Sequence, residues 1–581
     1  MAPLRLALIS RYLRPHRRTV LLGMAALVVV NLLSVSIPLQ VRHVIDDLQE
    51  GFSLATLWRQ SGLILVLATA MGGVRLVSRM LVFGVGRQVE ADLKQRIFDH
   101  LLLQEPGWVQ STGSGDVISR ATSDVENVRR LLGFAVLSLT NTALAYALTL
   151  PAMLAIDPWL SLAAVGLYRV MLAVVGLFGG RMMRHQRSQQ GSRAGLSDLF
   201  QEDRSGISAI KIYGQESVEQ RAFAQRNRRY RDAALQLART RSTLFPLLEG
   251  ISSVSLLLLL ALGSGQLESG RLSIGDLVAL ILYVERLVFP TALLGFTLNT
   301  FQTGQVSLER IETLLERIPA IRSPLHPAKA PAPHGALEAR NLSLRYPGSD
   351  RLSLDHVSFR LEPGELVAVV GPVGCGKTTL ARCIGRTVEV EPRSLFLDDV
   401  DITELNLGDL RSRVAIVPQE GFLFTASLAD NLRYGDPDAS QGRIEQAALQ
   451  ARLADDIKGF PDGYGTLVGE RGITLSGGQR QRTALGRALL GSAPLLVLDD
   501  ALASVDNNTA AAILRSVREQ EGRTILMISH QLSAAACDRI LVMEDGRVVQ
   551  QGTHQALLRQ GGTYRRLWER QQAEQQLQAT S

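Results

Sequence analysis

Six long apolar stretches in the first half of the chain constrain its fold more than any other feature. They cover about residues 19–39, 57–83, 131–156, 159–180, 245–265 and 274–296, and no comparable stretch follows. Each is close to or longer than the roughly 20 residues that an α-helix needs to cross a bilayer. We therefore predict six membrane-spanning helices, an even number that places both ends of the chain on the same side.

The charges between these stretches predict which side that is. Lys and Arg concentrate before the first stretch and in two long connections, about 84–130 and 181–244, whereas the other connections are short and nearly free of them. Cytoplasmic loops carry such an excess of positive charge. We therefore predict a multi-pass protein of the cell membrane with both termini in the cytoplasm. Basic loops also explain the net charge of +7, and without an aromatic-interleaved basic patch we expect no nucleic-acid partner.

Composition predicts the domain boundaries. Helical periodicity continues from the spans into the long connections and breaks at residues 112–120 and 205–214, which we interpret as the turning points of cytoplasmic hairpins. Five prolines fall within residues 317–335, a composition typical of a linker. We predict a membrane domain over 1–316, a linker over 317–335, an α/β domain over 336–570 and a tail over 571–581.

Among the ionisable residues within the predicted spans we single out Arg169, Glu249, Glu285 and Arg286. A charge at membrane depth is costly and usually faces a cavity or a partner. One interpretation is a polar patch in a substrate path. The other is structural: Glu285 and Arg286 lie near a span end, or the charges pair with one another.

A glycine-rich segment in the last third of the chain predicts a nucleotide site. Residues 371–379 fit the pattern G-x-x-x-x-G-K-[ST], in which backbone N–H groups cradle phosphates, Lys377 reaches the β- and γ-phosphates and the Thr378 hydroxyl reaches Mg²⁺. A short apolar strand precedes the segment and a helix start follows, which disfavours a chance glycine turn. The predicted ATP-binding residues here are Gly371, Gly374, Cys375, Gly376, Lys377, Thr378 and Thr379.

Polar residues follow other predicted strands. Asp499 and Asp500 end the apolar run 495–498, where one carboxylate can hold Mg²⁺ and a second can orient an attacking water. Gln419 follows the strand 414–417, and His530 follows 524–528, placed to touch a γ-phosphate. Tyr346 offers an aromatic face to adenine.

A second anion site is predicted at the start of another helix. Leu475 is followed by Ser476, Gly477, Gly478 and Gln479, and the N–H groups at such a helix start bind anions. If this helix and the P-loop helix each follow their own strands, the two cannot hold the same phosphate. The second site suits a nucleotide bound by a second copy.

In this order and spacing, the P-loop, the Leu-Ser-Gly-Gly-Gln signature, Asp499 and His530 resemble the nucleotide-binding domain of ATP-binding cassette (ABC) transporters. Six spans ahead of one cassette resemble a half-transporter of the exporter type. The resemblance implies a six-helix exporter-type transmembrane domain followed by an α/β P-loop cassette, with ATP and Mg²⁺ as cofactors. It further implies ATP-driven export of an amphipathic drug, lipid or peptide by alternating access.

The resemblance also implies roles for single residues. Two cassettes meet head to tail, so that each ATP lies between one P-loop and the other chain's signature, with Gln419 sensing Mg²⁺ and water. Ser504 and Asp506 belong to the loop that crosses the interface. The stretches near Gly115 and Gly206 resemble elements that dock on the cassettes.

One residue departs from the family pattern. The family usually has Glu as catalytic base after the Mg²⁺-binding Asp, and this chain has Asp500, which is one methylene shorter. We expect the site on this chain's P-loop to be slow, and we favour a heterodimer whose partner half-transporter supplies Glu. The alternatives are a homodimer with two slow sites and a membrane-embedded ATP-binding regulator that does not pump. An importer is disfavoured because importers usually carry spans and cassette on separate chains.

Overall fold

The computed structural model describes residues 6–50, 54–505, 507–518, 522–529 and 537–580. The chain divides into two compact units, one of Met1–Leu102 and Gly113–Arg317 and the other of Leu103–Thr112 and Ile318–Ser581. Two predicted functional residues, Asp506 and His530, lie outside the described residues.

The first unit is helical. Its long helices are α2 (Arg17–Glu50), α3 (Leu54–Leu103), α7 (Val136–Ile156), α8 (Pro158–Ser205), α10 (Glu216–Glu268) and α11 (Ile274–Leu315). Its shorter elements are α1 (Leu6–Leu13), η1 (Arg14–His16), α5 (Ser114–Ser119), η2 (Arg120–Asp124), α6 (Val125–Arg130), η3 (Leu131–Ala135) and α9 (Ile207–Tyr213). Among the described residues, six helical segments are long and apolar enough to cross a membrane, which confirms the six predicted spans.

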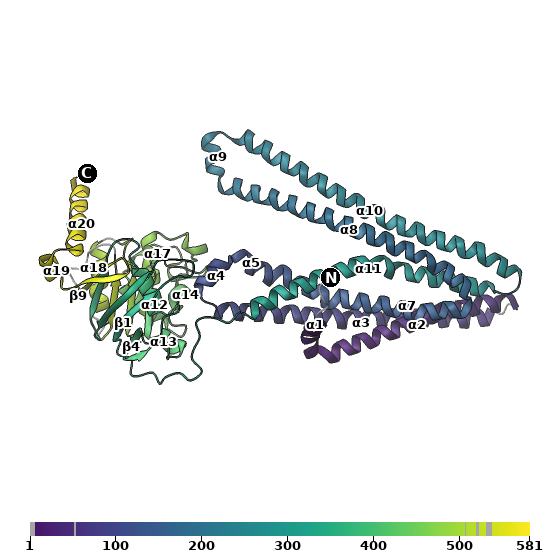
Figure 1. Cartoon of the computed structure of the whole chain (residues 1–581), viewed down its shortest axis with the longest axis horizontal. Helices are drawn as coiled ribbons and strands as arrows, with labels where there is room; N and C mark the ends of the chain where they lie inside the picture. The colour runs from purple at the N-terminus through teal and green to yellow at the C-terminus, as the bar shows by residue number, and fades with distance from the viewer. Residues whose placement is uncertain (1–5, 51–53, 506, 519–521, 530–536, 581) are drawn as a thin grey trace. The chain divides into compact units, whose positions relative to one another are not determined.

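Two features of the sequence define the hairpin of α8 and α10. Asp157 lies between α7 and α8. Its side chain accepts a hydrogen bond from the Leu160 N–H at 2.8 Å, which caps α8. At the other end, α8 stops at Ser205, α9 follows, and Gly214 adopts a left-handed conformation before α10 begins. The pair runs side by side away from the bundle of α2, α3, α7 and α11 and carries α9 at its tip (Figure 1).

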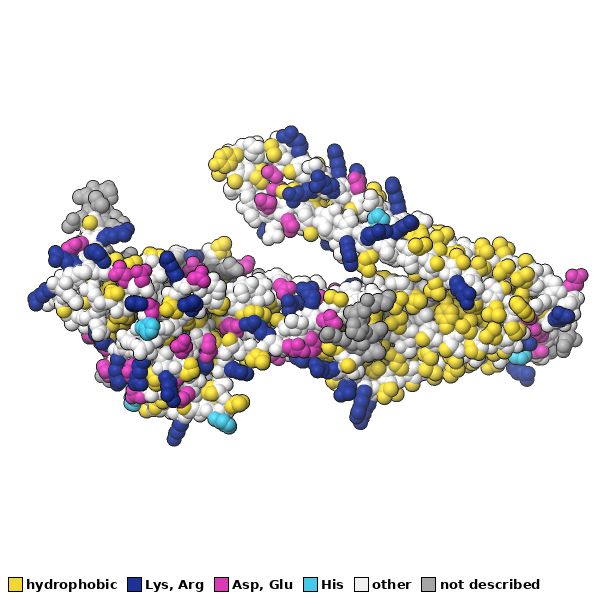
Figure 2. Space-filling model, viewed as in Figure 1, with side chains coloured by type: hydrophobic (Ala, Val, Ile, Leu, Met, Phe, Trp, Pro, Cys, Tyr) yellow, Lys and Arg dark blue, Asp and Glu magenta, His cyan; other side chains and the backbone are white. Residues whose placement is uncertain are grey.

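The surface of this unit differs along its helices. Apolar side chains cover the bundle, and Lys and Arg gather on the part of the α8–α10 hairpin nearest α9 (Figure 2). Large apolar side chains such as Leu21 and Leu65 are two-thirds exposed. An apolar outer face with Lys and Arg concentrated toward one end is typical of a membrane-spanning unit.

Polar contacts join α2 to the start of α11. The Asp46 carboxylate accepts hydrogen bonds from the Gly275 N–H and the Ser273 hydroxyl, each at 3.0 Å. Arg42 forms an ion pair with Asp276 at 2.7 Å. Asp46 thereby satisfies the Gly275 N–H, one of the groups at the start of α11 that have no partner within the helix.

The second unit contains two sheets. The antiparallel sheet has the order β2-β1-β4-β5, from β1 (Leu337–Leu344), β2 (Leu354–Leu361), β4 (Leu395–Leu397) and β5 (Val400–Asp401). The larger sheet has the order β10-β9-β3-β8-β7-β6, from β3 (Leu366–Val370), β6 (Val414–Val417), β7 (Leu495–Asp499), β8 (Thr524–Ile528), β9 (Arg539–Glu544) and β10 (Arg547–Gly552). Its strands β9, β3, β8, β7 and β6 are parallel, and β10 is antiparallel to β9.

Helices surround these sheets. They are α4 (Pro106–Thr112), α12 (Lys377–Ile384), α13 (Leu407–Arg413), α14 (Leu428–Arg433), α15 (Gln441–Gln450), α16 (Ala454–Lys458), η4 (Gly463–Gly465), η5 (Glu470–Gly472), α17 (Gly477–Leu490), α18 (Asn507–Arg518), α19 (His554–Gln560) and α20 (Thr563–Thr580).

Strand β3 lies at the centre of the core and is buried along its whole length. Val367 and Val369 pack into one core with Leu380 of α12. Leu366, Ala368 and Val370 face the opposite core, which includes side chains of α17 and α18. A parallel strand that packs against a hydrophobic core on each face has a continuous apolar sequence. Residues 366–370 form such a run. The fold therefore confirms the predicted class, a six-helix membrane unit and an α/β cassette.

The compact units differ from the predicted domain ranges in two places. Residues 103–112 fall in the second unit, where the Glu105 carboxylate accepts a hydrogen bond from the Ala320 N–H at 3.3 Å. The predicted boundary at 570 falls inside α20. The residues on both sides of that boundary are mostly Gln, Glu, Arg and Ala, which are strong helix formers, so the helix continues.

Candidate nucleotide-binding site

The carboxyl ends of neighbouring parallel strands bring the predicted residues together. The P-loop follows β3, Gln419 follows β6, and Asp499 and Asp500 end β7. Strand β8 lies between β3 and β7 and leads toward His530, which is outside the described residues. Ligands of open α/β sheets bind outside this edge.

The P-loop has a backbone that only glycine permits at two positions. Gly376 has φ +102°, and a Cβ there would lie 2.4 Å from the Ser353 carbonyl oxygen. A Cβ on Gly371 would lie 2.1 Å from the Met543 carbonyl oxygen. The loop therefore wraps closely against its surroundings and leads directly into α12, whose first N–H groups have no partner within the helix.

Lys377 lies inside this loop. Its buried ammonium group donates hydrogen bonds to the Gly371 and Pro372 carbonyls, each at 2.8 Å, and lies 3.6 Å from the Cys375 sulfur. Burial raises the pKa of the Cys375 thiol above its ordinary value, although Lys377 acts in the opposite direction. The thiol is therefore neutral near pH 7, and Lys377 is the cation of the loop.

A hydroxyl and a carboxylate meet beside the P-loop. The Thr378 hydroxyl donates a hydrogen bond to Asp499 Oδ1 at 3.2 Å, and Asp499 is buried. Oxygen donors of this kind suit Mg²⁺, which proteins usually hold through one or two carboxylates, retained waters and the phosphates of a nucleotide. Among the described residues no group of three or more His, Cys, Asp or Glu could hold a metal ion. The residues thus fit an ion that arrives with a nucleotide better than one held by protein alone.

Asp500 and Gln419 also lie together. The Asp500 N–H donates to the Ile528 carbonyl at 2.9 Å, which fixes the residue against β8 with φ +51°. The exposed Gln419 amide donates to the Asp500 carboxylate at 3.5 Å, a long contact. The side chains of Gln419, which follows β6, and of Asp500, which follows β7, therefore lie next to each other.

The signature opens α17 with a reciprocal cap. The Ser476 hydroxyl accepts from the Gln479 N–H at 3.3 Å, and the Gln479 side chain accepts from the Ser476 N–H at 2.9 Å. Gly477 lines a cavity of about 780 Å³ together with Gln419 and Ser504. None of the described residues that line that cavity belongs to the P-loop.

The sequence interpretation missed a positioning residue beside the signature. Gln481, buried on α17, accepts a hydrogen bond from the Ser504 N–H at 2.9 Å and donates to the Gln419 carbonyl at 3.4 Å. It thereby joins two loops that the resemblance treats separately. Its only signal in the sequence is its place just after the signature.

Tyr346 lies beside the P-loop helix, as the adenine prediction requires. Its hydroxyl donates to the Thr379 hydroxyl at 3.5 Å and accepts from Arg382 at 3.4 Å. The half-buried ring packs against the core beneath the antiparallel sheet.

The four charged residues predicted in the spans have different surroundings. Arg286 lines one cavity of the helical unit, and Glu249 and Glu285 line another. Arg169 is exposed on α8 and lines neither cavity. The sequence interpretation missed Arg75 and Arg79, which share the cavity of Arg286 although both lie within the predicted span 57–83.

Comparison with known proteins identifies the family. The profile described as "ABC transporter transmembrane region" matches residues 20–291, and the profile described as "ABC transporter" matches residues 354–503. The chain is 32% identical over 572 residues to the "Multidrug resistance-like ATP-binding protein MdlA" of Escherichia coli strain K12, covering 98% of this chain and 97% of that protein.

Two further comparisons agree. The chain is 32% identical over 508 residues to the "ATP-dependent lipid A-core flippase" of Pseudomonas aeruginosa strain PAO1, covering 87% of this chain and 84% of that protein. The structure of a bacterial Atm1-family ABC exporter with ATP bound superposes with a TM-score of 0.79 and 25% identity, covering 97% of this chain and 99% of that one. The chain therefore belongs to the ABC transporter family, as an exporter that carries its transmembrane domain and its ATP-binding cassette on one polypeptide.

Proposed function

We propose that this protein is one half of a two-chain transporter that uses ATP to export an amphipathic molecule from the cytoplasmic side of the membrane. One observation carries the proposal: a single chain joins six apolar helices to a cassette in which Lys377 lies in a P-loop and Thr378 contacts Asp499. The printed names of the relatives, which concern multidrug resistance and a lipid flippase, support an amphipathic substrate.

The proposed roles follow from the placement of the described groups and, for His530, from the family resemblance alone. Backbone N–H groups of residues 371–379 and the Lys377 ammonium bind the ATP phosphates, and Tyr346 stacks on adenine. Thr378, Asp499 and Gln419 hold Mg²⁺, which neutralises charge on the phosphates. Asp500 orients the attacking water, and His530 contacts the γ-phosphate.

The second copy of the cassette completes each site. We assign Ser476, Gly477, Gly478 and Gln479 to the ATP held by the partner cassette, because the signature opens α17 whereas the P-loop leads into a different helix, α12. Bound ATP would then lie between two chains and draw them together, and the spans would turn from inward-open to outward-open. The basic connections support a cytoplasmic location for both termini and for the cassette.

Asp500 supports a heterodimer. Its carboxylate is one methylene short of Glu, and a misplacement of about 1 Å can reduce a rate on the order of 10²-fold. This chain would bind ATP at a slow site and lend its intact signature to a partner that carries the catalytic Glu. A homodimer with two slow sites is the competing assembly.

Substrate-stimulated ATPase activity in reconstituted vesicles tests the proposal against a regulator that binds ATP without pumping. The chain, alone or with a candidate partner, should hydrolyse ATP faster when an amphipathic substrate is added. The Lys377→Ala substitution, together with its counterpart in the P-loop of the partner, should abolish this increase. Turnover that no substrate changes would contradict the proposal and favour the regulator.

A further inference from the structure

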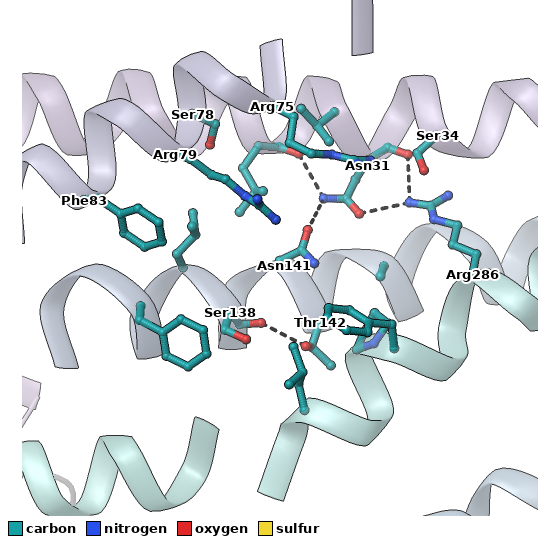
Figure 3. A pocket seen from close by; sticks show the side chains of 18 residues that line it. Asn31, Ser34, Arg75, Ser78, Arg79, Phe83, Ser138, Asn141, Thr142 and Arg286 are labelled. Carbon is teal, nitrogen blue, oxygen red and sulfur yellow. Dashed lines mark hydrogen bonds between the residues drawn. The ribbon is translucent and has the colours of Figure 1, made fainter. Parts of the chain in front are cut away.

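The helical unit contains a partly open cavity of about 540 Å³ among α2, α3, α7 and α11. Figure 3 shows polar side chains from all four helices directed toward it, including Asn31, Arg75, Arg79, Asn141 and Arg286. The volume lies within the range of about 300–1,000 Å³ that is usual for small-molecule sites. All of its lining residues belong to the membrane unit.

The cavity is strongly positive. Arg75 and Arg79 are four residues apart on α3 and therefore share one face of that helix, and Arg286 comes from α11. Among the described residues that line the cavity, none is Asp or Glu. Glu285 lies next to Arg286 in the sequence, but it lines the other cavity with Glu249. Neighbouring residues on a helix point about 100° apart, so Glu285 does not neutralise this site.

Asn31 holds Arg286 in place, and one Arg286 donor has no partner. Arg286 Nη2 donates to the Asn31 carbonyl at 3.3 Å and to the Asn31 side-chain oxygen at 3.0 Å. The Asn31 amide donates in turn to Asn141 Oδ1 at 3.1 Å. Arg286 Nη1 is buried and has no hydrogen-bond partner. The Arg75 guanidinium donates to the Met71 sulfur at 3.4 Å, a weak acceptor.

A buried cationic donor without a partner, such as Arg286 Nη1, is costly, and a ligand that supplies an acceptor removes that cost. Arg75 and Arg79 line the same cavity with exposed side chains that are free of that burial cost. Guanidinium groups match the oxygens of carboxylates and phosphates better than any other ligand groups, often with two parallel hydrogen bonds. Three guanidinium groups in one cavity whose described lining residues include no carboxylate therefore favour a ligand that carries an oxyanion. A neutral or cationic headgroup would leave their charge uncompensated.

The remaining walls are apolar. Side chains such as Leu27, Val30, Leu137, Phe134 and Phe289 line the same space. Arg75 lies eight residues before the inner end of the predicted span 57–83, about 12 Å along a helix at 1.5 Å per residue. An anion bound at this depth has to belong to a molecule whose remaining part is apolar, because the bilayer core solvates neither polar nor charged groups.

We propose that this cavity binds the phosphate or carboxylate headgroup of an anionic amphiphile, and that such an amphiphile is the transported substrate. The second half of the proposal rests on the export function proposed above. Arg286, oriented by Asn31, grips the headgroup, Arg75 and Arg79 neutralise it, and the apolar walls receive its tail.

Equilibrium binding to the full-length protein in neutral-lipid nanodiscs tests the site. The probes are oleoyl-lysophosphatidic acid, oleate, oleoyl-lysophosphatidylcholine and inorganic phosphate, titrated by native mass spectrometry. The two anionic amphiphiles should bind at least about 10-fold more tightly than the phosphatidylcholine analogue, since charge-assisted hydrogen bonds are the strong ones. Inorganic phosphate should bind far more weakly, because it lacks a tail.

Variants assign the effect to the arginines. Arg286→Gln and Arg79→Gln should each weaken binding of lysophosphatidic acid about 10-fold or more, and Arg286→Lys should restore part of the loss. Arg169→Gln removes the same charge from an exposed position in another span and should bind as the unmodified chain does. Arg79→Gln is the safer variant if Arg286→Gln fails to fold, because Arg79 is exposed.

The outcomes separate this inference from the proposed function. Equal binding of the anionic and phosphatidylcholine analogues, arginine variants that bind normally, or phosphate that binds as tightly as the amphiphiles would each overturn the site. Arginine-dependent binding without ATP-driven transport would keep the site and remove the export function. Transport of another amphiphile with arginine-independent binding would do the reverse.

Discussion

Asp500 is the residue proposed to orient the attacking water, and its side chain is one methylene shorter than that of Glu. Its backbone is fixed by the hydrogen bond to Ile528, and its carboxylate is reached by Gln419 only at 3.5 Å. The neighbouring Asp499 contacts Thr378 and belongs to the proposed Mg²⁺ site. The two carboxylates thus have separate tasks, and only that of Asp500 depends on its length.

Substitution of Asp500 should therefore change ATP turnover in a specific direction. Asp500→Glu should raise turnover at this chain's own P-loop, by up to about 10²-fold, because the longer side chain restores the position of the base. Asp500→Asn should leave turnover of a heterodimer nearly unchanged, since the partner's Glu serves the active site. Turnover is measured on the purified chain alone and with its candidate partner.

Asp499→Asn serves as the control, because it should weaken Mg²⁺-dependent ATP binding whichever assembly is correct. If the chain alone is active and Asp500→Asn abolishes that activity, Asp500 is a working base in a homodimer and the heterodimer proposal fails.

Cys375 offers a probe of the phosphate loop through its protonation. Burial raises the pKa of this thiol above its ordinary value, and only the thiolate reacts with alkylating reagents. At pH 7.5 its alkylation should be slower than that of a free thiol, and the rate should rise with pH through and beyond pH 9. ATP should protect Cys375, and Cys375→Ser provides the control in mass-spectrometric mapping. Fast alkylation at pH 7 that ATP does not affect would contradict this placement.

At the scale of elements, the turn from β3 to α12 depends on its glycines. Gly376→Ala places a Cβ 2.4 Å from the Ser353 carbonyl at φ +102°, which should cost about 1–3 kcal/mol in backbone strain alone. We expect a lower unfolding temperature and a loss of ATP-analogue affinity, measured on the same detergent-solubilised protein.

Gly442→Ala is the matched control for that substitution. Gly442 lies near the start of α15, and a Cβ there meets nothing within 4 Å. Since Ala favours a helix over Gly, this variant should be unchanged or more stable by roughly 0.4–1 kcal/mol. Normal ATP-analogue binding by Gly376→Ala would show that the loop does not have the described conformation.

The sequence predicts elements well where one local signal suffices. Length and hydropathy identify the six spans, and the apolar run 366–370 followed by a glycine loop identifies β3 and α12. The sequence alone does not show that Arg75 and Arg79 share a cavity with Arg286, because that depends on the packing of α3 and α11. Neither does it show the contact of Glu105 with Ala320, which places residues 103–112 in the second unit. These features depend on tertiary contacts between residues far apart in the sequence.

At the scale of the whole molecule, two units have separate requirements that one chain combines. The helical unit exposes apolar side chains such as Leu21 and Leu65, which a bilayer or a second chain must cover. The cassette has an α/β core with a hydrophobic cluster on each face of β3, and its signature opens α17 whereas its P-loop leads into α12. Both properties are expected of a half-transporter that acts only when it is paired in a membrane.

The most direct test of the central claim is transport itself. Inside-out vesicles that contain the full-length protein with its candidate partner should accumulate a fluorescent amphiphile when ATP and Mg²⁺ are added. Accumulation should cease when the Lys377→Ala substitution and its counterpart in the partner disable both P-loops, while the amount of protein in the membrane stays the same. Accumulation that is absent with ATP, or that persists in the Lys377→Ala vesicles, would contradict ATP-driven export by this protein.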